Sequence, residues 1–469
     1  ALTHPHITTD FSEAQLELIT SVHAEPDGAI AELRDVHRFI YQNLGEELLW
    51  AGSMPCILGS DAEIPVGRYG TSNIATAKTV YRLGLGHRYG RLMQTISGIH
   101  YNFSLPEIFW VPFAESRGAR PGQSFQTDSY FGLIRNFRRH SWLLIYLFGA
   151  SPAICRSFVK DKPHRLEVFD EGSLYLPHGT SLRMGRLGYQ SDAQSSLHIS
   201  YNSLDEYADS MQAALTQPYP AYEKIGVKVN GQYRQLSTSL LQIENEFYGT
   251  IRPKRPVRAG ERPLTALRSR GVEYVEVRCL DLNPFLPEGI DAVEARFVNL
   301  FLLHCLLTDS PPDSEQESAI MAANQLAIVE RGRAPGLMLQ TQAGPVSMQD
   351  WAGRVLDDLR PLATLLDGIH GDDLYTYSLD QQAAKLADPA LTPSARMLHI
   401  MKSQQIPYFR FTMNQSIAHK GYFDEHPLRD ADLAAFQRIA RASIDEQLEM
   451  EASDAVDFDT FLEDYLAFK

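Results

Sequence analysis

The sequence predicts an α+β protein in which a sheet is covered by helices on one side and open on the other. Two observations carry this prediction. Strand-like segments with one polar face concentrate before residue 290, and helical patterns dominate after it. A sheet that packs on helices through one face leaves its second face free to be polar. We therefore expect a sheet-containing catalytic region at 1–290 and a mostly helical region at 291–469, packed together as one large unit.

The composition is that of a globular protein, with 44% hydrophobic residues among 469. The net charge of −15 argues against a nucleic-acid binder or a protein of anionic membranes, because both partners repel an acidic surface. The longest apolar run, residues 142–150, is far shorter than the roughly 20 residues that span a bilayer. The start of the sequence shows no signal-peptide pattern. We expect a cytoplasmic monomer that binds small molecules.

The four cysteines are Cys56, Cys155, Cys279 and Cys305. They form no CxxC pair, and their spacings suit no zinc site. Isolated thiols in a long chain are typical of the reducing cytoplasm. The sequence therefore predicts separate, buried structural cysteines.

Helices and strands alternate up to residue 152. Helical spacing of apolar residues predicts helices at 30–44 and 75–95, and a buried helix at 130–152. Strand-like alternation ends the segment 7–22 and fills 95–106, where it stops at a proline. In the second of these strands, one face carries His100, Asn102 and Ser104.

Two later segments also alternate like strands. "LQIENEFY", residues 241–248, would place Glu244, Glu246 and Tyr248 on one face. "GVEYVEVRCLDLNPF", residues 271–285, would place Tyr274, Glu276 and Arg278 on one face and Glu273, Val275 and Val277 on the other.

After residue 290 the pattern is helical. A capping box, Ser314 with Glu317, begins one helix, and Gly332 ends it. The acidic tail at 441–469 predicts an amphipathic helix that packs on the body through apolar residues at i, i+3, i+4 and i+7. Those residues are Phe458, Phe461, Leu462 and Tyr465.

No P-loop, HExxH or GxSxG motif occurs in the sequence. It carries instead a set of acidic faces on predicted strands: Asp10 and Glu17, His100 with Asn102, Glu244 with Glu246, and Glu276 with Arg278. Carboxylates on a rigid sheet hold hard cations such as Mg²⁺ beside substrate phosphates. A neighbouring arginine and the basic loop "IRPKRPVR" would neutralise a transferring phosphoryl group. The set favours a metal–nucleotide site, without separating a ligase from a kinase or a phosphatase.

Each of these features also has a structural interpretation. Glu276 and Arg278 could form a surface ion pair, worth under about 1 kcal/mol. His100 could be a structural hydrogen-bonding residue, the tyrosines could be packing residues, and the basic loop could simply be solvated.

Long ordered blocks of the sequence resemble one known family. They include "ALTHPHITTDFSEAQLELIT" at 1–20, "YGTSNIATAKTVYRLGLGHRYGRLMQTISGIHYNFSLPE" at 69–107, "YLPHGTSLRMGRLGYQ" at 175–190, "LLQIENEFYGTIRPKR" at 240–255 and "GVEYVEVRCLDLNPF" at 271–285. On these blocks the chain resembles the proteobacterial glutamate–cysteine ligases, over essentially its whole length. The resemblance implies a curved, largely antiparallel sheet that forms an active-site funnel, related to glutamine synthetase.

The resemblance also implies an activity and a set of site residues. The activity is the ATP- and Mg²⁺-dependent (or Mn²⁺-dependent) joining of L-glutamate to L-cysteine through a γ-glutamyl phosphate. Glu276 and Arg278 would be catalytic. Independently of the resemblance, the position of the basic loop after an acidic predicted strand would let Arg252 or Lys254 contact ATP. The metal ligands would be Asp10, Glu17, His100 and Glu276; the substrate contacts would be Arg183, Tyr81, Tyr189, Tyr248, Gln94 and Asn102.

The resemblance implies a further segment before Ala1, on the order of 50 residues, the length of one supersecondary unit. In the family that segment carries a Glu-x-Glu strand with metal ligands. Because the sequence also lacks an initial methionine, we expect it to be an incomplete copy of the chain. Two other hypotheses stay open: a γ-glutamyl ligase that uses a different amine, and a non-catalytic relative that binds ligand or a partner subunit.

Overall fold

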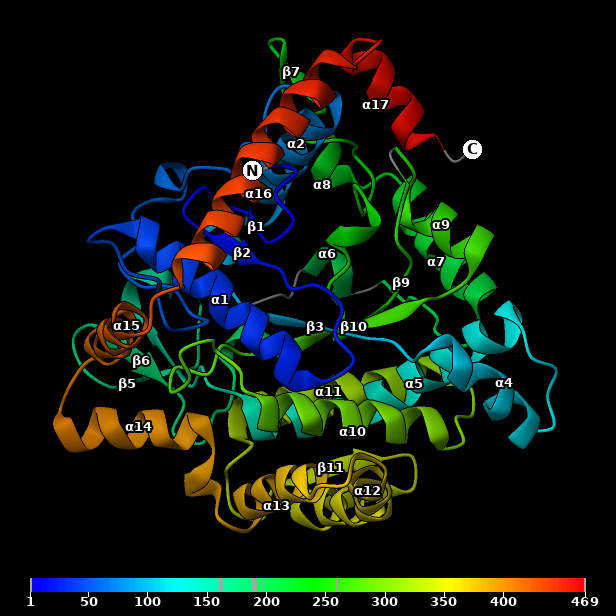
Figure 1. Cartoon of the computed structure of the whole chain (residues 1–469), viewed down its shortest axis with the longest axis vertical. Coiled ribbons are helices and arrows are strands. Elements are labelled where there is room, and N and C mark those ends of the chain that lie inside the picture. The colour runs from blue at the N-terminus through cyan, green and yellow to red at the C-terminus, as the bar shows by residue number, and fades with distance from the viewer. Residues whose placement is uncertain (1, 160–162, 188–191, 196, 259, 468–469) are drawn as a thin grey trace.

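A computed structural model describes residues 2–159, 163–187, 192–195, 197–258 and 260–467. Within these ranges the strands form small antiparallel sheets, and helices dominate the second part of the chain (Figure 1). The predicted α+β class is therefore confirmed. The strands, grouped by sheet, are β1 (Ile7–Thr9) with β2 (Leu16–Leu18); β3 (Ile99–Phe103), β10 (Tyr274–Leu280) and β9 (Ile251–Lys254); β4 (Ala153–Cys155), β6 (Ser173–Tyr175) and β5 (Glu167–Val168); β7 (Lys228–Val229) with β8 (Gln232–Tyr233); and β11 (Met338–Thr341) with β12 (Gly344–Ser347).

Helices occur both before and after residue 290. Those before it are α1 (Pro26–Leu44), α2 (Asn73–Tyr89), α3 (Arg91–Gln94), α4 (Glu107–Ser116), α5 (Gln123–Phe148), α6 (Asp192–Ser195), α7 (Leu204–Thr216), α8 (Pro220–Glu223) and α9 (Pro263–Arg270). Those after it are α10 (Ala292–Leu307), α11 (Glu315–Arg331), α12 (Met348–His370), α13 (Leu374–Ala387), α14 (Pro393–Gln404), α15 (Tyr408–Glu425), α16 (Asp430–Ala452) and α17 (Phe458–Leu466). Short 3-10 turns lie at η1 (Asp61–Glu63), η2 (Arg156–Val159), η3 (Leu182–Met184), η4 (Glu244–Glu246) and η5 (Pro389–Leu391).

The sheet of β3, β10 and β9 lies across the centre of the molecule (Figure 1). Val275 and Val277 of β10 and Ile251 of β9 are fully buried on one face, in the same apolar cluster as α5 and α10. In Figure 1, α5, α10 and α11 lie below this sheet, and β1, β2 and α2 lie above it. The alternating pattern therefore predicts correctly that one face of the sheet packs on helices.

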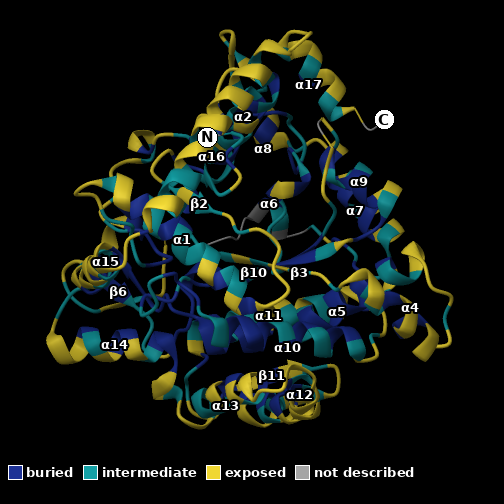
Figure 2. Cartoon of the chain, viewed as in Figure 1, coloured by how far each residue is buried: buried dark blue, intermediate teal, exposed yellow. Residues whose placement is uncertain are grey.

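The main core centres on α5 and α10, whose ribbons are largely dark blue in Figure 2. Phe297, Leu300 and Phe301 of α10 are fully buried against this core. The α12–α13 pair covers the outer side of α10 (Figure 1). The helical second part of the chain thus completes the core that supports the central sheet.

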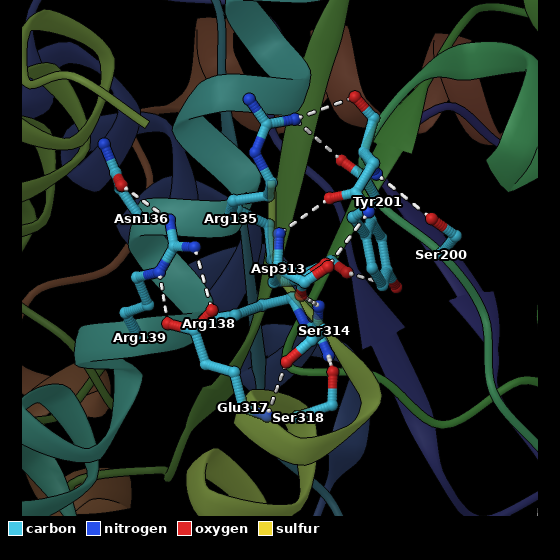
Figure 3. A network of polar contacts seen from close by, with 12 residues as sticks. Arg135, Asn136, Arg138, Arg139, Ser200, Tyr201, Asp313, Ser314, Glu317 and Ser318 are labelled. Atoms are coloured by element: carbon cyan, nitrogen blue, oxygen red, sulfur yellow. Dashed lines mark hydrogen bonds and ion pairs between the residues drawn. The ribbon is translucent and has the colours of Figure 1, made fainter. Parts of the chain in front are cut away.

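Arginines of α5 fasten the start of α11 to the core (Figure 3). Arg138 forms an ion pair with Asp313, and Arg139 forms one with Glu317 at 2.7 Å. Ser314 caps α11 by accepting a hydrogen bond from the Glu317 amide at 3.1 Å. The predicted cap is therefore correct at Ser314. The Glu317 carboxylate, however, binds Arg139, because a charged partner on α5 outcompetes the local contact of a capping box.

The predicted strand at 241–248 is wrong. Residues 244–246 form the turn η4, and both glutamates in it are buried beside arginines. The sequence alternates like a strand there, but each carboxylate is held by a charged partner distant in the sequence: Glu244 by Arg262 at 3.0 Å, and Glu246 by Arg88 at 2.8 Å. These ion pairs fold the segment inward and leave no acidic strand face.

The cysteine prediction is wrong for one pair. Cys56 and Cys155 are joined by a disulfide with a Cα–Cα distance of 5.3 Å, across a separation of 99 residues. Cys279 and Cys305 are free and buried, as predicted. Spacing alone could not identify the bonded pair, because the fold brings together two segments that are distant in the sequence.

The tail prediction is confirmed for its last helix. Phe458, Phe461 and Leu462 of α17 pack on Ala77 and Val80 of α2. Asp457 caps the helix by accepting a hydrogen bond from the Thr460 amide at 2.8 Å.

Candidate active site

The candidate site lies on the polar face of the central sheet. β10 is the middle strand, and Glu276 is opposite Asn102 of β3 and Arg252 of β9. Because side chains alternate along a strand, these residues share one face with Lys254 and Arg278. The valines between them hold the strand in place by packing on the core. The face that the sequence predicts to be polar is therefore built from all three strands.

Glu276 is surrounded by cations. It is 8% exposed, and it accepts a hydrogen bond from Arg278 at 2.6 Å and forms an ion pair with Lys254 at 3.2 Å. Burial alone would raise the pKa of Glu276, but Arg278, Lys254 and Arg252 outweigh it and hold that pKa well below its usual range. The carboxylate therefore stays ionised, and the cations around it exceed its single negative charge.

Arg252 reinforces this positive potential. Its side chain is buried, and it donates a hydrogen bond to the carbonyl of Asn245 at 2.9 Å and another to that of Phe247. Among the residues that the structure describes, its Nε atom has no hydrogen-bond partner. Burial and the neighbouring Arg278 lower the pKa of Arg252, as expected where two guanidinium groups share a low-dielectric site. Such a site favours an anionic ligand.

His100 lies at the edge of this cluster. Its Nδ1 is 3.5 Å from Nη1 of Arg278. The ring reaches solvent, yet the surrounding protein and the Arg278 charge lower the pKa of His100 well below 6.5. His100 is therefore neutral at physiological pH and has a nitrogen lone pair. Asn102, on the same face of β3, is exposed to solvent.

Asp10 and Glu17 come from the β1–β2 hairpin. Glu17 is opposite Thr8, and the Asp10 amide donates to the carbonyl of Gln15 at 2.9 Å to close the turn. Burial raises the pKa of Asp10, and burial with the nearby Asp10 charge raises that of Glu17 to about 7. These carboxylates thus form a crowded acidic pair.

The charges of this acidic pair and those of the sheet cluster act on one another. Arg278 lowers the pKa of Asp10, and Glu276 contributes to raising that of Glu17, so the hairpin and the sheet face interact electrostatically. Among the described residues, no three His, Cys, Asp or Glu side chains are grouped closely enough to hold a metal ion by themselves.

Lys78 and Arg82 of α2 also belong to this site, and the sequence reasoning missed them. Arg82 donates a hydrogen bond to the carbonyl of Asp10 and lies 4.5 Å from the centre of the Tyr69 ring. Glu17 favours the charged form of Lys78, although burial lowers the Lys78 pKa overall. Two cations four residues apart on one helix were the available signal.

The predicted substrate residues come from several elements, and the structure joins two of them, Gln94 and Tyr248, directly. Gln94 is buried, and its Nε2 donates to the hydroxyl of Tyr248 at 3.1 Å. Tyr81 on α2 has a raised pKa, through burial first and the Glu246 charge second. Tyr189 lies outside the described residues.

Arg183 lies in η3 and is fully buried. Its Nε forms an ion pair with Asp281 at 2.9 Å. Its Nη2 donates to the carbonyls of Arg278 and Leu280 at 3.0 and 2.7 Å. These contacts fix the end of β10, and a role in substrate binding stays a prediction.

Within the described ranges, no helix combines the length and apolar character needed to cross a bilayer.

Comparisons with known proteins identify a family that the chain resembles over its whole length. A family model described as glutamate-cysteine ligase matches residues 1–328. The glutamate–cysteine ligase of Pseudomonas fluorescens is 50% identical over 468 residues, 100% of this chain and 88% of that protein. That of Pseudomonas putida is also 50% identical, over 100% of this chain and 89% of that protein.

Solved structures give the same result. A crystal structure of glutamate–cysteine ligase from Francisella tularensis, in complex with AMP, matches with a TM-score of 0.92 and 36% identity. The match covers 99% of this chain and 91% of that one. A bifunctional glutathione synthetase from Pasteurella multocida matches with a TM-score of 0.69 and 24% identity, over 90% of this chain and 49% of that one. At that identity the second match shows similarity of fold alone.

Proposed function

This chain belongs to the glutamate–cysteine ligase family, and from that membership we propose how its residues carry out the reaction. It is an ATP-dependent ligase that joins the γ-carboxylate of L-glutamate to the amine of L-cysteine, giving γ-glutamylcysteine, the first step of glutathione synthesis. The observation that carries our assignment of the active face is the cluster of Arg252, Lys254 and Arg278 around Glu276.

The chemistry explains why such a cluster is needed. A carboxylate is a poor electrophile, so one oxygen must first become a leaving group, and transfer of the ATP γ-phosphoryl group produces an acyl phosphate. Charge on the transferring group must be neutralised while the reacting oxygens lie in line. We assign Arg278 to the phosphoryl oxygens, because its planar guanidinium matches their geometry. The cysteine amine then attacks the acyl carbon, and phosphate leaves.

We assign Arg252 and Lys254 to the remaining phosphates of ATP. Both lie on β9 beside Glu276. The Nε of buried Arg252, which has no partner in the described part of the chain, supports an anionic ligand at this position. Burial also lowers the pKa of Lys254, so a bound phosphate would relieve the cost of crowding these cations.

The residues present fit a divalent cation. Asp10 and Glu17 form an acidic pair with raised pKa values, and oxygen ligands suit Mg²⁺ or Mn²⁺. A site without a complete protein cage is usual for Mg²⁺, which binds through one or two carboxylates together with substrate phosphates. We propose that Asp10, Glu17 and Glu276 hold it, with His100 beside them. When bound, it would neutralise charge on the ATP phosphates.

We place the amine substrate among Tyr81, Tyr248, Gln94 and Asn102, with Tyr189 as a further predicted contact. The hydrogen bond from Gln94 to the Tyr248 hydroxyl supports a shared pocket. We keep Arg183 as a predicted glutamate contact. Its ion pair with Asp281 and its hydrogen bonds to the carbonyls at the end of β10 also support a role in holding Arg278 in place.

We further propose that the protein acts as a monomer, so that one chain suffices for catalysis. Consumption of ATP favours reaction in the cytoplasm. Specific activity that is constant across a dilution series, with a monomeric mass by light scattering, would support the first point; activity confined to a larger species would contradict it.

The experiment that tests the function measures ADP release with ATP, Mg²⁺ and glutamate, together with a panel of amines. We expect turnover with cysteine, and none when glutamate or the cation is omitted. Greater kcat/KM with another amine would show a different acceptor specificity. An absence of ADP release with every amine would identify a non-catalytic relative.

A further inference from the structure

Arg88 and Glu246 form an ion pair that is wholly removed from solvent. Arg88 lies in the last turn of α2, and Glu246 ends η4. Their charged atoms are 2.8 Å apart, and both side chains have no exposed surface. Desolvation of two charges makes such a pair a poor source of stability, whereas buried ionic groups in some proteins fix a unique geometry.

The Glu246 carboxylate is fully used within the protein. Besides Arg88, it accepts hydrogen bonds from the Tyr89 hydroxyl at 2.7 Å and the Gln242 amide at 2.7 Å. Arg88 also donates to the side chain of Gln235 at 2.9 Å. This arrangement holds the loop that leads to Tyr248 against the end of α2.

From Glu246 the hydrogen bonds continue to Tyr248. The Tyr89 hydroxyl accepts from Nε2 of Gln194 at 3.1 Å, and Oε1 of Gln194 accepts from the Tyr248 amide at 3.1 Å. Nε2 of Gln194 also donates to the Glu246 carbonyl at 2.9 Å. The backbone of Tyr248 is therefore attached to the buried ion pair through two side chains.

The Tyr248 ring is fixed as well. It lies edge-on to the Tyr89 ring, with centroids 5.8 Å apart, and its hydroxyl accepts the hydrogen bond from Gln94. Burial and the Glu246 charge raise the pKa of Tyr89, so its hydroxyl remains protonated and keeps donating to Glu246. Tyr89 thus contacts Tyr248 through its ring, and its hydroxyl is linked to the Tyr248 backbone through Gln194.

We propose that Glu246, acting through Tyr89 and Gln194, is a positioning residue that fixes Tyr248 in the amine pocket and so sets the preference for cysteine. The inference rests on the proposed function, which places Tyr248 in that pocket. A rigid aromatic wall discriminates among small amine substrates by shape, and discrimination is lost when the wall can move. Glu246 touches no reacting atom in this scheme.

The test uses Tyr89→Phe, which removes one hydroxyl and keeps the ring. We expect the KM for cysteine to rise about three- to tenfold, the size of one lost hydrogen bond, while the KM for glutamate and ATP stays unchanged. The preference for cysteine over 2-aminobutyrate, its isostere without the thiol, should fall. Glu246→Gln should act in the same direction; if it does not fold, Tyr89→Phe carries the test alone.

Tyr101→Phe is the matched control. Its hydroxyl donates to Asn299 at 2.8 Å on the helix-covered side of the sheet, so its loss should leave the cysteine KM and the substrate preference unchanged. If Tyr89→Phe raised the KM for all three substrates, the variant would have a general loss of structure. If it left the KM for cysteine unchanged, Tyr89 would have no positioning role. Either result overturns the proposal.

Tyr248→Ala separates this proposal from the proposed function. If it raises the cysteine KM, and Tyr89→Phe adds nothing in that background, the effect of Tyr89 passes through Tyr248. If Tyr248→Ala raises the cysteine KM while Tyr89→Phe alone has no effect, the positioning role fails and the pocket stands. If Tyr248→Ala leaves the cysteine KM unchanged, the pocket assignment itself is wrong, and the positioning proposal falls with it.

Discussion

Glu276 has two functions in the proposed site that a single substitution can test. It balances the cations of β9 and β10, and it is an assigned ligand of the divalent cation. Glu276→Gln keeps the size of the side chain and removes its charge. We expect kcat to fall by about two orders of magnitude, as when one preorganised electrostatic group is lost, and the Mg²⁺ concentration for half-maximal rate to rise. Steady-state assays across a Mg²⁺ titration measure both.

Glu273 provides the matched control for this substitution. It lies just before β10, its side chain is half exposed, and it pairs with Arg255 at 3.1 Å. Surface pairs of this kind contribute little, so Glu273→Gln should change neither kcat nor the Mg²⁺ requirement. If both variants lost activity equally, or if neither lost activity, the polar face of β10 would not be the active face.

Glu294 is a buried carboxyl group outside the proposed site, and it predicts a pH-dependent stability. It accepts a hydrogen bond from Asn283 at 2.9 Å, but burial, with a further contribution from Asp291, raises its pKa to about 7. The folded state therefore keeps a proton that the unfolded chain releases above about pH 4.5, and the stability contribution of Glu294 falls as the pH rises from there to 7.

Glu294→Gln should remove this dependence. We expect the variant to have a free energy of unfolding about 1–3 kcal/mol above that of the original chain at pH 8 and no advantage at pH 4.5. Urea titrations at the two pH values measure the difference. Glu446→Gln, at an exposed position in the second half of α16, controls for the loss of one negative charge. An advantage that did not depend on pH would contradict the assignment to Glu294.

At the scale of elements, the disulfide joins a loop to β4 across a long stretch of chain. Cross-linking over 99 residues restricts the unfolded chain strongly, so Cys56→Ser should lower the free energy of unfolding by about 2–4 kcal/mol in the absence of reductant. With reductant present, the variant and the original chain should unfold alike. Thiol titration of the denatured, unreduced protein should find only Cys279 and Cys305; reaction at all the cysteines would show that the bond does not form.

The elements also show where sequence reasoning succeeds and where it stops. The face of β10 was predictable because Val275 and Val277 alternate with polar residues, and period two is a local property. The segment with Glu244 and Glu246 has the same alternation, yet it forms a turn because its partners are distant arginines. A periodic pattern records which side chains share a face, and it carries no information about partners far away in the chain.

The candidate site also contains residues that a local pattern predicts and residues that it does not. Glu276 and Arg278 follow from the strand pattern, whereas Asp10 and Glu17 are joined to them only by the resemblance and by the fold. Lys78 and Arg82 were not predicted, and neither were the hydrogen bonds that link Glu246 to Tyr248. Both depend on how α2 packs against the hairpin and against η4. Helix packing of this kind is set by tertiary contacts that no single segment contains.

At the scale of the whole molecule, the regions 1–290 and 291–469 share one core. Helix α10 is buried between α5 and the α12–α13 pair, and α17 returns from the end of the chain to cover α2. The sheet that carries the site therefore rests on helices from the second region. This arrangement supports the prediction that the two regions form one unit, which an unfolding experiment can test.

We predict that the chain unfolds in one cooperative transition and that residues 1–290 alone do not fold. The rings of Trp142 on α5 and Trp351 on α12 lie 5.0 Å apart, so tryptophan fluorescence reports on the contact between the regions. Its transition should coincide with that of far-UV circular dichroism, as two-state unfolding requires.

Phe297→Ala, at the centre of the shared core, should lower the midpoints of both transitions together, with a loss of about 3–5 kcal/mol in the free energy of unfolding. Because α10 packs on α5, which in turn packs on β10, and also on α13, hydrogen exchange should increase in β10 and in α13 alike. Separate transitions, or a cooperative transition in the isolated segment 1–290, would mean that the catalytic sheet folds without its helical support.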